Sequence, residues 1–323
     1  MSVESPLFWP AKFEGDTLFV LDETLLPEKI RYVKVKNVAQ AVKVIRDMKT
    51  RAFGQFLVVL SAFLLVLASN KKSNDKVLVA QLEAAALALN KSRPTFPFAE
   101  VTSMVVGWAK KCLAEGVDVK SSLEKNIQGF LMAIRGRRLE RVRKLAEALK
   151  SHASILTHCN VSGELAMAVA ICKAEGKELK VFATETRPYF QGAKLTAWEL
   201  RAVGVHITLV ADNAVATLLS QGKVNAVVIG SDRNCANGDI ANKIGSYQIA
   251  VVAKEFGVPV YVLTQPSKGI ATGQDIPIEI RDEKELLVFQ GRRIAPKGVK
   301  GFYPGFDVVF SELITQAIPI NVQ

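Results

Sequence analysis

The hydrophobic pattern of the first half of the chain predicts a small sheet followed by helices. From Gly15 to Val35, apolar and polar residues alternate around a turn at Leu26-Pro27, which is typical of a small antiparallel sheet. From Val38 to about Leu149, apolar residues recur at helical spacing instead. We therefore expect an N-terminal domain over residues 1–150 that is mostly helical and begins with a small antiparallel sheet.

A different rhythm begins after about Ala153. Helical stretches such as Glu164–Ala174 and Ile240–Phe256 separate short apolar runs, each of the length of one strand. These runs are Ser154–Thr157, Val181–Thr184, His206–Val210, Ala226–Ile229 and Pro259–Leu263. Repeated alternation of strand and helix predicts a doubly wound parallel sheet with helices on both faces. The expected fold class is α/β, with a Rossmann-like catalytic domain over residues 151–323.

The most apolar run of the chain is Phe56–Ala68, which only Ser61 interrupts. It is shorter than the roughly 20 residues that a membrane-spanning helix needs, so we interpret it as a buried core helix. The N-terminus lacks a basic stretch followed by an apolar one, unlike a secretory signal. We expect a globular cytoplasmic protein with no membrane partner.

The net charge of +11 raises the question of nucleic-acid binding. The basic residues are spread along the chain, however, and the densest run, Arg135–Lys144, is interleaved with apolar residues at helical spacing. We interpret this run as the solvated face of a helix, and we expect no nucleic-acid partner. A positive field also suits a small phosphorylated substrate. The four cysteines are too few and too scattered for a disulfide framework.

Polar residues follow four of the predicted strands at the point where each strand ends. The four clusters are Thr157–Asn160, Thr184–Pro188, Ala211–Asn213 and Gly230–Asn234. Ligands of doubly wound sheets bind beyond the carboxyl ends of the strands. The sequence therefore predicts an active site at this edge of the sheet.

Cys159 and Asp232 are the residues of these clusters best suited to catalysis. Cys159 stands where a strand stops and a turn with Gly163 leads into a helix, whose first N–H groups favour a thiolate. The alternative is a buried structural cysteine. Asp232 follows an apolar strand, where partial desolvation would raise its pKa and suit it to acid–base catalysis. The alternative is a carboxylate that caps a turn or helix.

The segment Asn237–Gly245 is interpreted as a polar loop that opens a helix. Backbone N–H groups together with Lys243 would hold a phosphate there. The segment is not a Walker loop, because the glycine spacing and the Lys-Ser/Thr pair are absent. Arg51, Arg93 and Arg187 are further candidate phosphate ligands, and surface ion pairs are the alternative for each of them.

Longer motifs of this chain closely resemble those of S-methyl-5-thioribose-1-phosphate isomerases. The motifs are Leu21–Pro27, Leu156–Asn160, Glu185–Leu200, Gly230–Arg233, Asn237–Gly245, Ile276–Glu279, Ile294–Val299 and Phe306–Asp307. They cover nearly the whole chain. The wider superfamily includes ribose-1,5-bisphosphate isomerases, 5-deoxyribose-1-phosphate isomerases and the regulatory subunits of a translation-initiation guanine-exchange complex.

The resemblance implies an aldose–ketose isomerase of methionine salvage. Its substrate would be a 5-substituted ribose 1-phosphate, first of all S-methyl-5-thio-α-D-ribose 1-phosphate, and its product the ribulose 1-phosphate. Asp232 would protonate the ring oxygen, and Cys159 would help to move hydrogen between C2 and C1, as a proton or as a hydride. The residues implied to hold the substrate and its phosphate are Arg51, Arg93, Gln191, Asn242 and Lys243. The resemblance further implies a homodimer that uses no metal and no cofactor.

Two alternatives remain beside this reading. One is an isomerase of 5-deoxyribose 1-phosphate or of another ribose phosphate. The other, from a different class, is a non-catalytic regulatory subunit that senses a sugar phosphate or a nucleotide. The regulatory subunits lack counterparts of both Cys159 and Asp232, so the presence of both residues favours an enzyme.

Two segments depart from the family pattern and bear on the substrate. Residues 51–56 carry Phe53 where the family has smaller residues, and residues 93–98 carry Phe96 and Phe98 in place of a stretch that includes an asparagine. The arginines that begin both segments are kept. We expect one of these phenylalanines to narrow the pocket for the 5-substituent and to favour the methyl group of 5-deoxyribose 1-phosphate.

Overall fold

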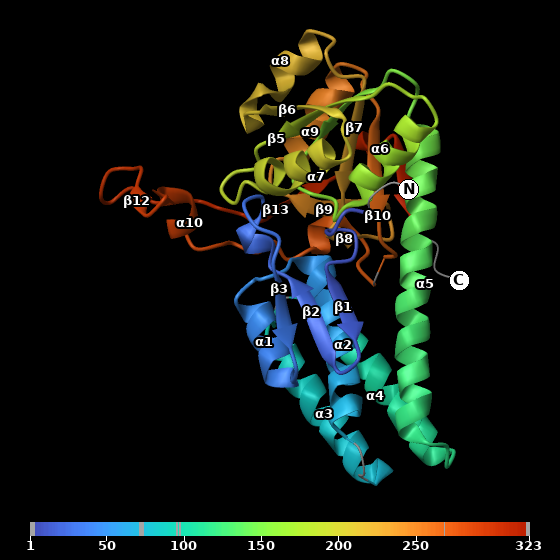
Figure 1. Cartoon of the computed structure of the whole chain (residues 1–323). Helices are drawn as coiled ribbons and strands as arrows, with labels where there is room; N and C mark the ends of the chain where they lie inside the picture. Colours follow the sequence, from blue (N-terminus) through green and yellow to red (C-terminus); the bar gives the residue numbers. More distant parts are fainter. Residues whose placement is uncertain (1–3, 71–73, 95, 97, 268, 321–323) are drawn as a thin grey trace. The chain divides into compact units, whose positions relative to one another are not determined.

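The computed structural model describes residues 4–70, 74–94, 96, 98–267 and 269–320, and the chain forms two compact units (Figure 1). The N-terminal unit is Pro6–Gly136, and the C-terminal unit comprises Met1–Ser5 and Arg137–Gln323. The two units divide within helix α5 (Val119–Ala148), whereas the boundary proposed after residue 150 lies just past the end of that helix.

A three-stranded antiparallel sheet begins the N-terminal unit, in the order β1–β2–β3. Its strands are β1 (Ala11–Glu14), β2 (Thr17–Leu21) and β3 (Tyr32–Val35). Leu18 pairs with Val35 and Val20 pairs with Ala11, and all four side chains are buried in the core of this unit. The small sheet expected between Gly15 and Val35 is therefore present, and its first strand begins earlier, at Ala11.

Helices form the rest of the N-terminal unit, as the spacing of apolar residues predicts. They are α1 (Val38–Arg46), α2 (Ala52–Ser69), α3 (Asp75–Asn90), α4 (Phe98–Ala114) and the first part of α5. The side chains of Asn37 and Asn74 cap α1 and α3 by accepting N–H bonds from Gln40 and Lys76.

Helix α2 is apolar around its whole circumference, which is typical of a helix at the centre of a core. Among the described residues, it is the one helix with the length and hydropathy to cross a membrane, and 72% of it is buried within the structure. The buried core helix expected at Phe56–Ala68 is confirmed by this burial.

A six-stranded parallel sheet organises the C-terminal unit. Its strands lie in the order β14–β10–β7–β4–β5–β6. They are β4 (Ser154–Thr157), β5 (Lys180–Thr184), β6 (His206–Val210), β7 (Ala226–Gly230), β10 (Val260–Thr264) and β14 (Gln316–Pro319). The five strands predicted from apolar runs are all confirmed within one residue, and β14 is a sixth that was not predicted.

The strand order reverses between β4 and β7, which are neighbours in the sheet although two strands separate them along the chain. This is the dinucleotide-fold order, in which the chain builds outward from the centre first in one direction and then in the other. In folds with this order, ligands bind in the crevice outside the carboxyl ends of the strands at the point of reversal. The order therefore predicts the position of a site at the carboxyl ends of these two strands.

Helices connect the strands of the parallel sheet. They are α6 (Glu164–Ala174), a π-helical turn η2 (Gly192–Thr196) with α7 (Ala197–Ala202), η3 (Asp212–Ala214) with α8 (Val215–Ser220), and α9 (Ser246–Glu255). Apolar residues of α8 and α9 pack with those of β7 and β10 in one core cluster. Helix α6 has the bounds that the sequence predicts.

The helix expected over Ile240–Phe256 is wrong in its first part. Residues Ile240–Lys243 form strand β9, and α9 begins only at Ser246, after Gly245 with a φ of +103°. Strand β9 pairs with β13 (Phe306–Val309) and with the short β8 (Arg233–Asn234) in a second, antiparallel sheet. The partner strand β13 lies more than 60 residues further along the chain, so local spacing could not indicate it.

A separate segment links β10 to β13. It contains η4 (Gly273–Asp275), α10 (Lys284–Leu287) and a two-stranded ribbon of β11 (Val288–Phe289) and β12 (Arg292–Arg293). Figure 1 shows α10 and β12 projecting away from the parallel sheet. The turn η5 (Ser311–Leu313) leads from β13 towards β14.

The basic run Arg135–Lys144 lies in α5, and the expectation that it forms a solvated face is wrong for two of its members. Arg138 and Arg141 are 2% and 4% exposed. Both lie against the buried carboxylate of Glu164, with nitrogen–oxygen distances of 2.6 Å. A buried anion on α6, invisible to local spacing, explains why these two cations are inside.

Candidate active site

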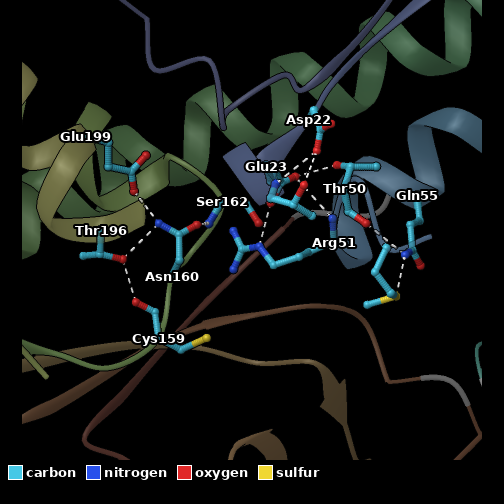
Figure 2. Close-up of polar contacts among 12 residues, drawn as sticks. Asp22, Glu23, Thr50, Arg51, Gln55, Cys159, Asn160, Ser162, Thr196 and Glu199 are labelled. Atoms are coloured by element: carbon cyan, nitrogen blue, oxygen red, sulfur yellow. Dashed lines mark hydrogen bonds and ion pairs between the residues drawn. The ribbon is translucent and has the colours of Figure 1, made fainter. Parts of the chain in front are cut away.

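Cys159 lies in a turn directly after β4, and two threonine side chains hold that turn. Its backbone N–H donates to Thr186 Oγ1 at 2.9 Å. Its carbonyl oxygen accepts from Thr196 Oγ1 at 2.6 Å (Figure 2). Cys159 has a φ of +62°, in the left-handed region that non-glycine residues rarely adopt. Its side chain is partly exposed. The turn thus presents the thiol at the carboxyl end of the sheet.

Further strained backbone surrounds this turn. Ser162, Thr186 and Phe190 also have positive φ angles, of +53°, +61° and +60°. Each such conformation costs on the order of 1–3 kcal/mol and persists only where the surroundings enforce it, which happens most often at active sites. The surrounding contacts therefore hold the loops after β4 and β5 in backbone conformations that are locally unfavourable.

Asn160 is fixed by three hydrogen bonds, so its amide orientation is defined. Its Nδ2 donates to Glu199 Oε1 at 2.7 Å and to Thr196 Oγ1 at 2.9 Å, and its Oδ1 accepts from the N–H of Ser162 at 2.9 Å (Figure 2). Glu199 is buried in α7. Asn160 thereby ties the turn that carries Cys159 to η2 and α7.

His158 precedes the cysteine but is engaged in structural bonds. Its Nε2 lies 2.8 Å from the carbonyl oxygen of Ile244, and its Nδ1 lies 2.6 Å from Thr184 Oγ1. A carbonyl only accepts, so Nε2 carries the proton and Nδ1 accepts from the threonine hydroxyl. Burial lowers the pKa of His158. His158 is therefore a neutral link between β4, β5 and the residue before Gly245.

Asp232 follows β7, the neighbour of β4, as the sequence predicts. Its backbone N–H donates to the carbonyl oxygen of Ala241 on β9 at 2.8 Å. The side chain is exposed, so the expected partial desolvation is wrong. Because Thr157 and Val228 are register partners of β4 and β7, Cys159 and Asp232 each lie a few residues beyond the same level of the sheet.

Gln191 stands at the start of η2 and carries a buried polar atom that the protein does not satisfy. Its Oε1 has no hydrogen-bond partner among the described residues. The next residue must be glycine, because a Cβ at Gly192 would lie 1.8 Å from the carbonyl oxygen of Thr184. Gln191 is thus placed tightly against the end of β5, with an acceptor left over for a ligand.

Asn242 and Lys243 lie on β9, next to the loop that carries Asp232. Asn242 Nδ2 donates to Ser246 Oγ at 2.8 Å, and its Oδ1 is within 3.9 Å of the space that a Cβ at Gly230 would occupy. Lys243 Nζ lies 5.0 Å from the ring centre of Phe306 and 5.6 Å from that of Tyr189. The strand, rather than the expected loop, therefore brings both residues to the end of β7.

Asp212 and Arg187 complete the edge of the sheet. Both carboxylate oxygens of Asp212 accept backbone N–H bonds, from Thr186 and Arg187, at 2.7 Å each. The guanidinium of Arg187 stacks on the rings of Phe190 and Phe289, 5.1 and 5.3 Å from their centres. Asp212 thus stabilises the strained loop, and Arg187 is held by two rings.

Asp307 on β13 lies at the N-terminus of α9. Its Oδ2 accepts from the N–H of Gly245 at 2.7 Å, whereas its buried Oδ1 has no partner among the described residues. Burial raises the pKa of Asp307 to about 6, although the N–H groups of the helix start favour its charged form. Asp307 belongs to one of the sequence motifs, but the motif did not predict a buried carboxylate at the start of a helix.

The N-terminal unit holds Arg51 through Glu23, which was not predicted. Glu23 is buried, and its Oε2 lies 2.6 Å from Arg51 Nε (Figure 2). Its Oε1 accepts from Thr50 Oγ1 at 2.5 Å and from the backbone N–H of Arg51 at 3.2 Å. One carboxylate thus fixes both the backbone and the side chain at the start of α2.

Arg93 is held in the same unit by Gln55. Gln55 Oε1 accepts from Arg93 Nη1 at 2.9 Å, and Gln55 Nε2 donates to the carbonyl oxygen of Thr50 at 2.9 Å. Thr50 therefore connects the arrangement around Arg93 to that around Arg51. Both arginines are prearranged by a buried polar side chain, which suits a planar cation that binds phosphate.

The three phenylalanines of the divergent segments differ in their surroundings. Phe98 is 1% exposed in the core of the N-terminal unit. Phe53 packs on Trp9 and Phe56, whereas Phe96 lies under the guanidinium of Arg93, 4.9 Å from its ring centre. Phe96 thus contacts a predicted phosphate ligand. Thr95 and Pro97, which flank it, lie outside the described residues.

In the described part of the chain, no group of three or more His, Cys, Asp or Glu side chains is arranged to hold a metal ion.

Comparison with known proteins identifies the family. Residues 55–319 match the model of the Initiation factor 2 subunit family, which is most of the chain. The chain belongs to this family.

Members of the family include isomerases of high similarity to this chain. A methylthioribose-1-phosphate isomerase from Desulforudis audaxviator is 38% identical, over 98% of this chain and 93% of the relative. A 5-deoxyribose 1-phosphate isomerase from Moorella thermoacetica is 35% identical, over 96% of this chain and 92% of the relative. These relatives confirm the resemblance drawn from the sequence motifs.

Solved structures of the family share the fold along nearly the whole chain. The 5-methylthioribose 1-phosphate isomerase from Pyrococcus horikoshii OT3 matches with a TM-score of 0.85 and 29% identity, over 98% of this chain and 93% of that one. The translation initiation factor eIF-2B, subunit delta, from A. fulgidus matches with a TM-score of 0.84 and 30% identity, over 96% and 94%. The α/β fold is thereby confirmed, and the fold alone does not separate the two functions.

Proposed function

We propose that this chain is an aldose–ketose isomerase that converts S-methyl-5-thio-α-D-ribose 1-phosphate to the corresponding ribulose 1-phosphate. One observation carries the proposal. Cys159 and Asp232 follow the two adjacent strands at which the strand order reverses, and β9, which carries Asn242 and Lys243, is hydrogen-bonded to Asp232 through Ala241. Ligands of this fold bind at that edge. The names of the related isomerases support the same reaction.

The proposed roles follow from the chemistry of the side chains. The phosphate on the anomeric oxygen blocks simple ring opening, so the ring C–O bond must break with assistance. Asp232 acts as the acid that protonates the ring oxygen, because an exposed carboxyl group at the site can exchange its proton with solvent between turnovers. Cys159 then assists the movement of hydrogen between C2 and C1.

Substrate binding is assigned to five further residues. Arginine and lysine bind phosphate through charge-assisted hydrogen bonds, and amide side chains bind sugar hydroxyl groups. The unpartnered Oε1 of Gln191 supports such a role directly, because a buried acceptor without a partner is otherwise costly. The residues proposed to hold the substrate are Arg51, Arg93, Gln191, Asn242 and Lys243.

A second candidate substrate is 5-deoxyribose 1-phosphate. It is favoured by the added volume of Phe53 and Phe96, which stand where the family has smaller residues. One related enzyme carries the name of this activity. A clear preference of the enzyme for the methylthio substrate would contradict this candidate.

Steady-state turnover of three substrates tests the proposed function. The substrates are S-methyl-5-thioribose 1-phosphate, 5-deoxyribose 1-phosphate and ribose 1,5-bisphosphate, with ketose formation as the readout. We expect conversion of one of the first two, and loss of conversion in Cys159→Ser and Asp232→Asn. If the wild-type protein binds a member of this set but converts none, the enzyme is excluded and a sugar-phosphate sensor is favoured.

The assembly and place of action complete the proposal. We propose a cytoplasmic homodimer that acts in methionine salvage. Tyr247, Val251 and Phe256 on and just after α9 are 40%, 41% and 44% exposed, which supports contact with a second copy. Sedimentation analysis of the wild type and of Val251→Glu tests this: a dimer is expected for the former, and a shift towards monomer for the latter.

A further inference from the structure

Tyr303 carries a hydroxyl group that the fold buries and leaves unsatisfied. The residue is 3% exposed, and its hydroxyl has no hydrogen-bond partner among the described residues. Its backbone is fixed, because its carbonyl oxygen accepts from the N–H of Arg281 at 2.8 Å and the next residue, Pro304, bridges to Ile280. The position of the hydroxyl is thus a consequence of well-anchored backbone.

The neighbouring tyrosine shows the opposite arrangement. The rings of Tyr189 and Tyr303 lie edge to face, with centres 6.2 Å apart. The hydroxyl of Tyr189 accepts from Arg281 Nη2 at 2.6 Å and also bonds to Glu285. Arg281 further pairs with Glu279 at 2.9 Å. This network satisfies the hydroxyl of Tyr189 completely and stops short of the hydroxyl of Tyr303.

Three contacts place Tyr303 with the proposed site residues. Tyr189, its ring partner, is two residues from Gln191 and lies under Lys243. Lys243 also lies over Phe306, three residues after Tyr303. Burial raises the pKa of the Tyr303 hydroxyl to about 12, and the charges of Glu285 and Cys159 add to that rise. Through its contact with Tyr189 and the position of Lys243 over Tyr189 and Phe306, Tyr303 shares the surroundings of Gln191 and Lys243.

A buried hydroxyl without a partner destabilises the fold, and phenylalanine in the same space would avoid that cost. The ring contact with Tyr189 needs no hydroxyl either. A bound ligand that forms the missing hydrogen bond would explain why such a hydroxyl is present. The unpartnered Oε1 of Gln191 is interpreted in the same way. The alternative is a ring that only fills space, with a hydroxyl of no consequence.

We propose that the Tyr303 hydroxyl donates a hydrogen bond to an oxygen of the sugar phosphate bound beside Cys159, and so contributes to substrate selection. This inference rests on the proposed function for the identity of the ligand. Since its pKa is raised to about 12, Tyr303 stays protonated at neutral pH and acts as a neutral donor and not as a base. Its donor orients the ribose relative to the thiol.

Tyr303→Phe tests this, because the change removes the hydroxyl and keeps the ring. We expect kcat/KM for the converted ribose 1-phosphate to fall roughly 10- to 100-fold, as for the loss of a buried hydrogen bond to substrate. The melting temperature without substrate should stay equal or rise, since an unsatisfied group is removed. Tyr189→Phe should instead lower it, because Arg281 and Glu285 lose a partner. Tyr261→Phe, near the start of β10 and away from the carboxyl ends of the strands, is the control for activity.

Each outcome decides between the two proposals. If the wild type converts its substrate and Tyr303→Phe does so equally well, the role of Tyr303 is refuted and the isomerase stands. In a second outcome, the wild type binds ribose 1-phosphates without converting them, and Tyr303→Phe binds them at least tenfold more weakly by calorimetry. This result refutes the isomerase activity and shows that Tyr303 binds the sugar phosphate. Wild-type protein that binds no member of the substrate set refutes both. A fall in the melting temperature of Tyr303→Phe with unchanged kcat/KM assigns Tyr303 to structure alone.

Discussion

The two units treat their buried polar groups differently. In the N-terminal unit, the polar side-chain atoms of Glu23 and Gln55 form hydrogen bonds. Their partners are Thr50, Arg51 and Arg93. In the C-terminal unit, Gln191, Tyr303 and Asp307 each keep one buried polar atom without a partner among the described residues. None of the buried unpartnered atoms in the described part of the chain belongs to the N-terminal unit.

The difference indicates how each unit would contribute to substrate binding. In the N-terminal unit, internal partners hold two cations in fixed positions, so their charge is ready for a phosphate. In the C-terminal unit, buried acceptors and donors are left for the ligand itself, and strained turns at Cys159 and Thr186 carry further cost. The first arrangement favours stability, and the second gives up stability for recognition.

The largest effect is expected from the proposed catalytic pair of the C-terminal unit. Cys159→Ser and Asp232→Asn should each lower kcat about 10²- to 10⁴-fold, the range for loss of an acid–base group. Stability should change little, because both side chains are at least partly exposed. Cys172→Ala, a buried cysteine of α6, is the matched control. Equal kcat values for Cys159→Ser and the wild type would remove the cysteine from the mechanism.

The next largest effect is expected on stability, from the buried ion pairs of Glu164 in the C-terminal unit. Glu164→Gln leaves Arg138 and Arg141 buried beside a neutral group. We expect the free energy of unfolding to fall by about 3–5 kcal/mol in urea denaturation, as for a broken buried pair. Glu175→Gln, exposed at the end of the same helix, should change it by less than about 0.5 kcal/mol. A small loss for Glu164→Gln would show that this network is solvated.

The carboxylate of Asp307 predicts a pH dependence of stability. Its folded pKa of about 6 lies above the unfolded value of 3.8, so the folded state binds more protons between them. The free energy of unfolding should therefore decrease as the pH rises from 4 to 6, by at most roughly 3 kcal/mol from this group. Asp307→Asn should remove that part of the slope. Identical slopes for the variant and the wild type would place the titration elsewhere.

The smallest effect separates the two arrangements directly. Glu23→Gln keeps acceptors for Thr50 but loses the charge that orients Arg51. We expect KM to rise roughly tenfold, since an arginine that must be ordered on binding holds phosphate less well, with kcat within about twofold. Glu28→Gln, exposed in the same loop region, is the control. A loss in kcat without a change in KM would contradict a purely preparatory role of the N-terminal network.

Much of the fold could be predicted from local patterns. The apolar runs that became β4 and β6, and the spacing that became α6, are properties of neighbouring residues, and their bounds match. Strand β9 could not be found in this way, because β13 supplies its hydrogen bonds from a distant part of the sequence. The strand order, which places the site, is likewise a long-range property.

The residues of the candidate site that directly follow strands could be predicted from the sequence. The residues that depend on contacts with distant parts of the chain could not. Cys159 and Asp232 stand directly after strands, so their position follows from the sheet. Glu23 matters through Thr50 and Arg51, more than 25 residues away, and Tyr303 through Tyr189, more than 100 residues away. Nothing in their own neighbourhoods distinguishes them from an ordinary helix cap or core ring.

The central claim is that the C-terminal edge of the parallel sheet performs an aldose–ketose conversion. The most direct measurement is carbon-13 NMR of S-methyl-5-thioribose 1-phosphate and of 5-deoxyribose 1-phosphate, each labelled at C2, during incubation with the wild-type protein and with Asp232→Asn. The account predicts that a ketone signal replaces the ring C2 signal of at least one substrate with the wild type, and that it fails to appear with Asp232→Asn. Persistence of the ring signal of both substrates with the wild type, under conditions in which they bind, would contradict it.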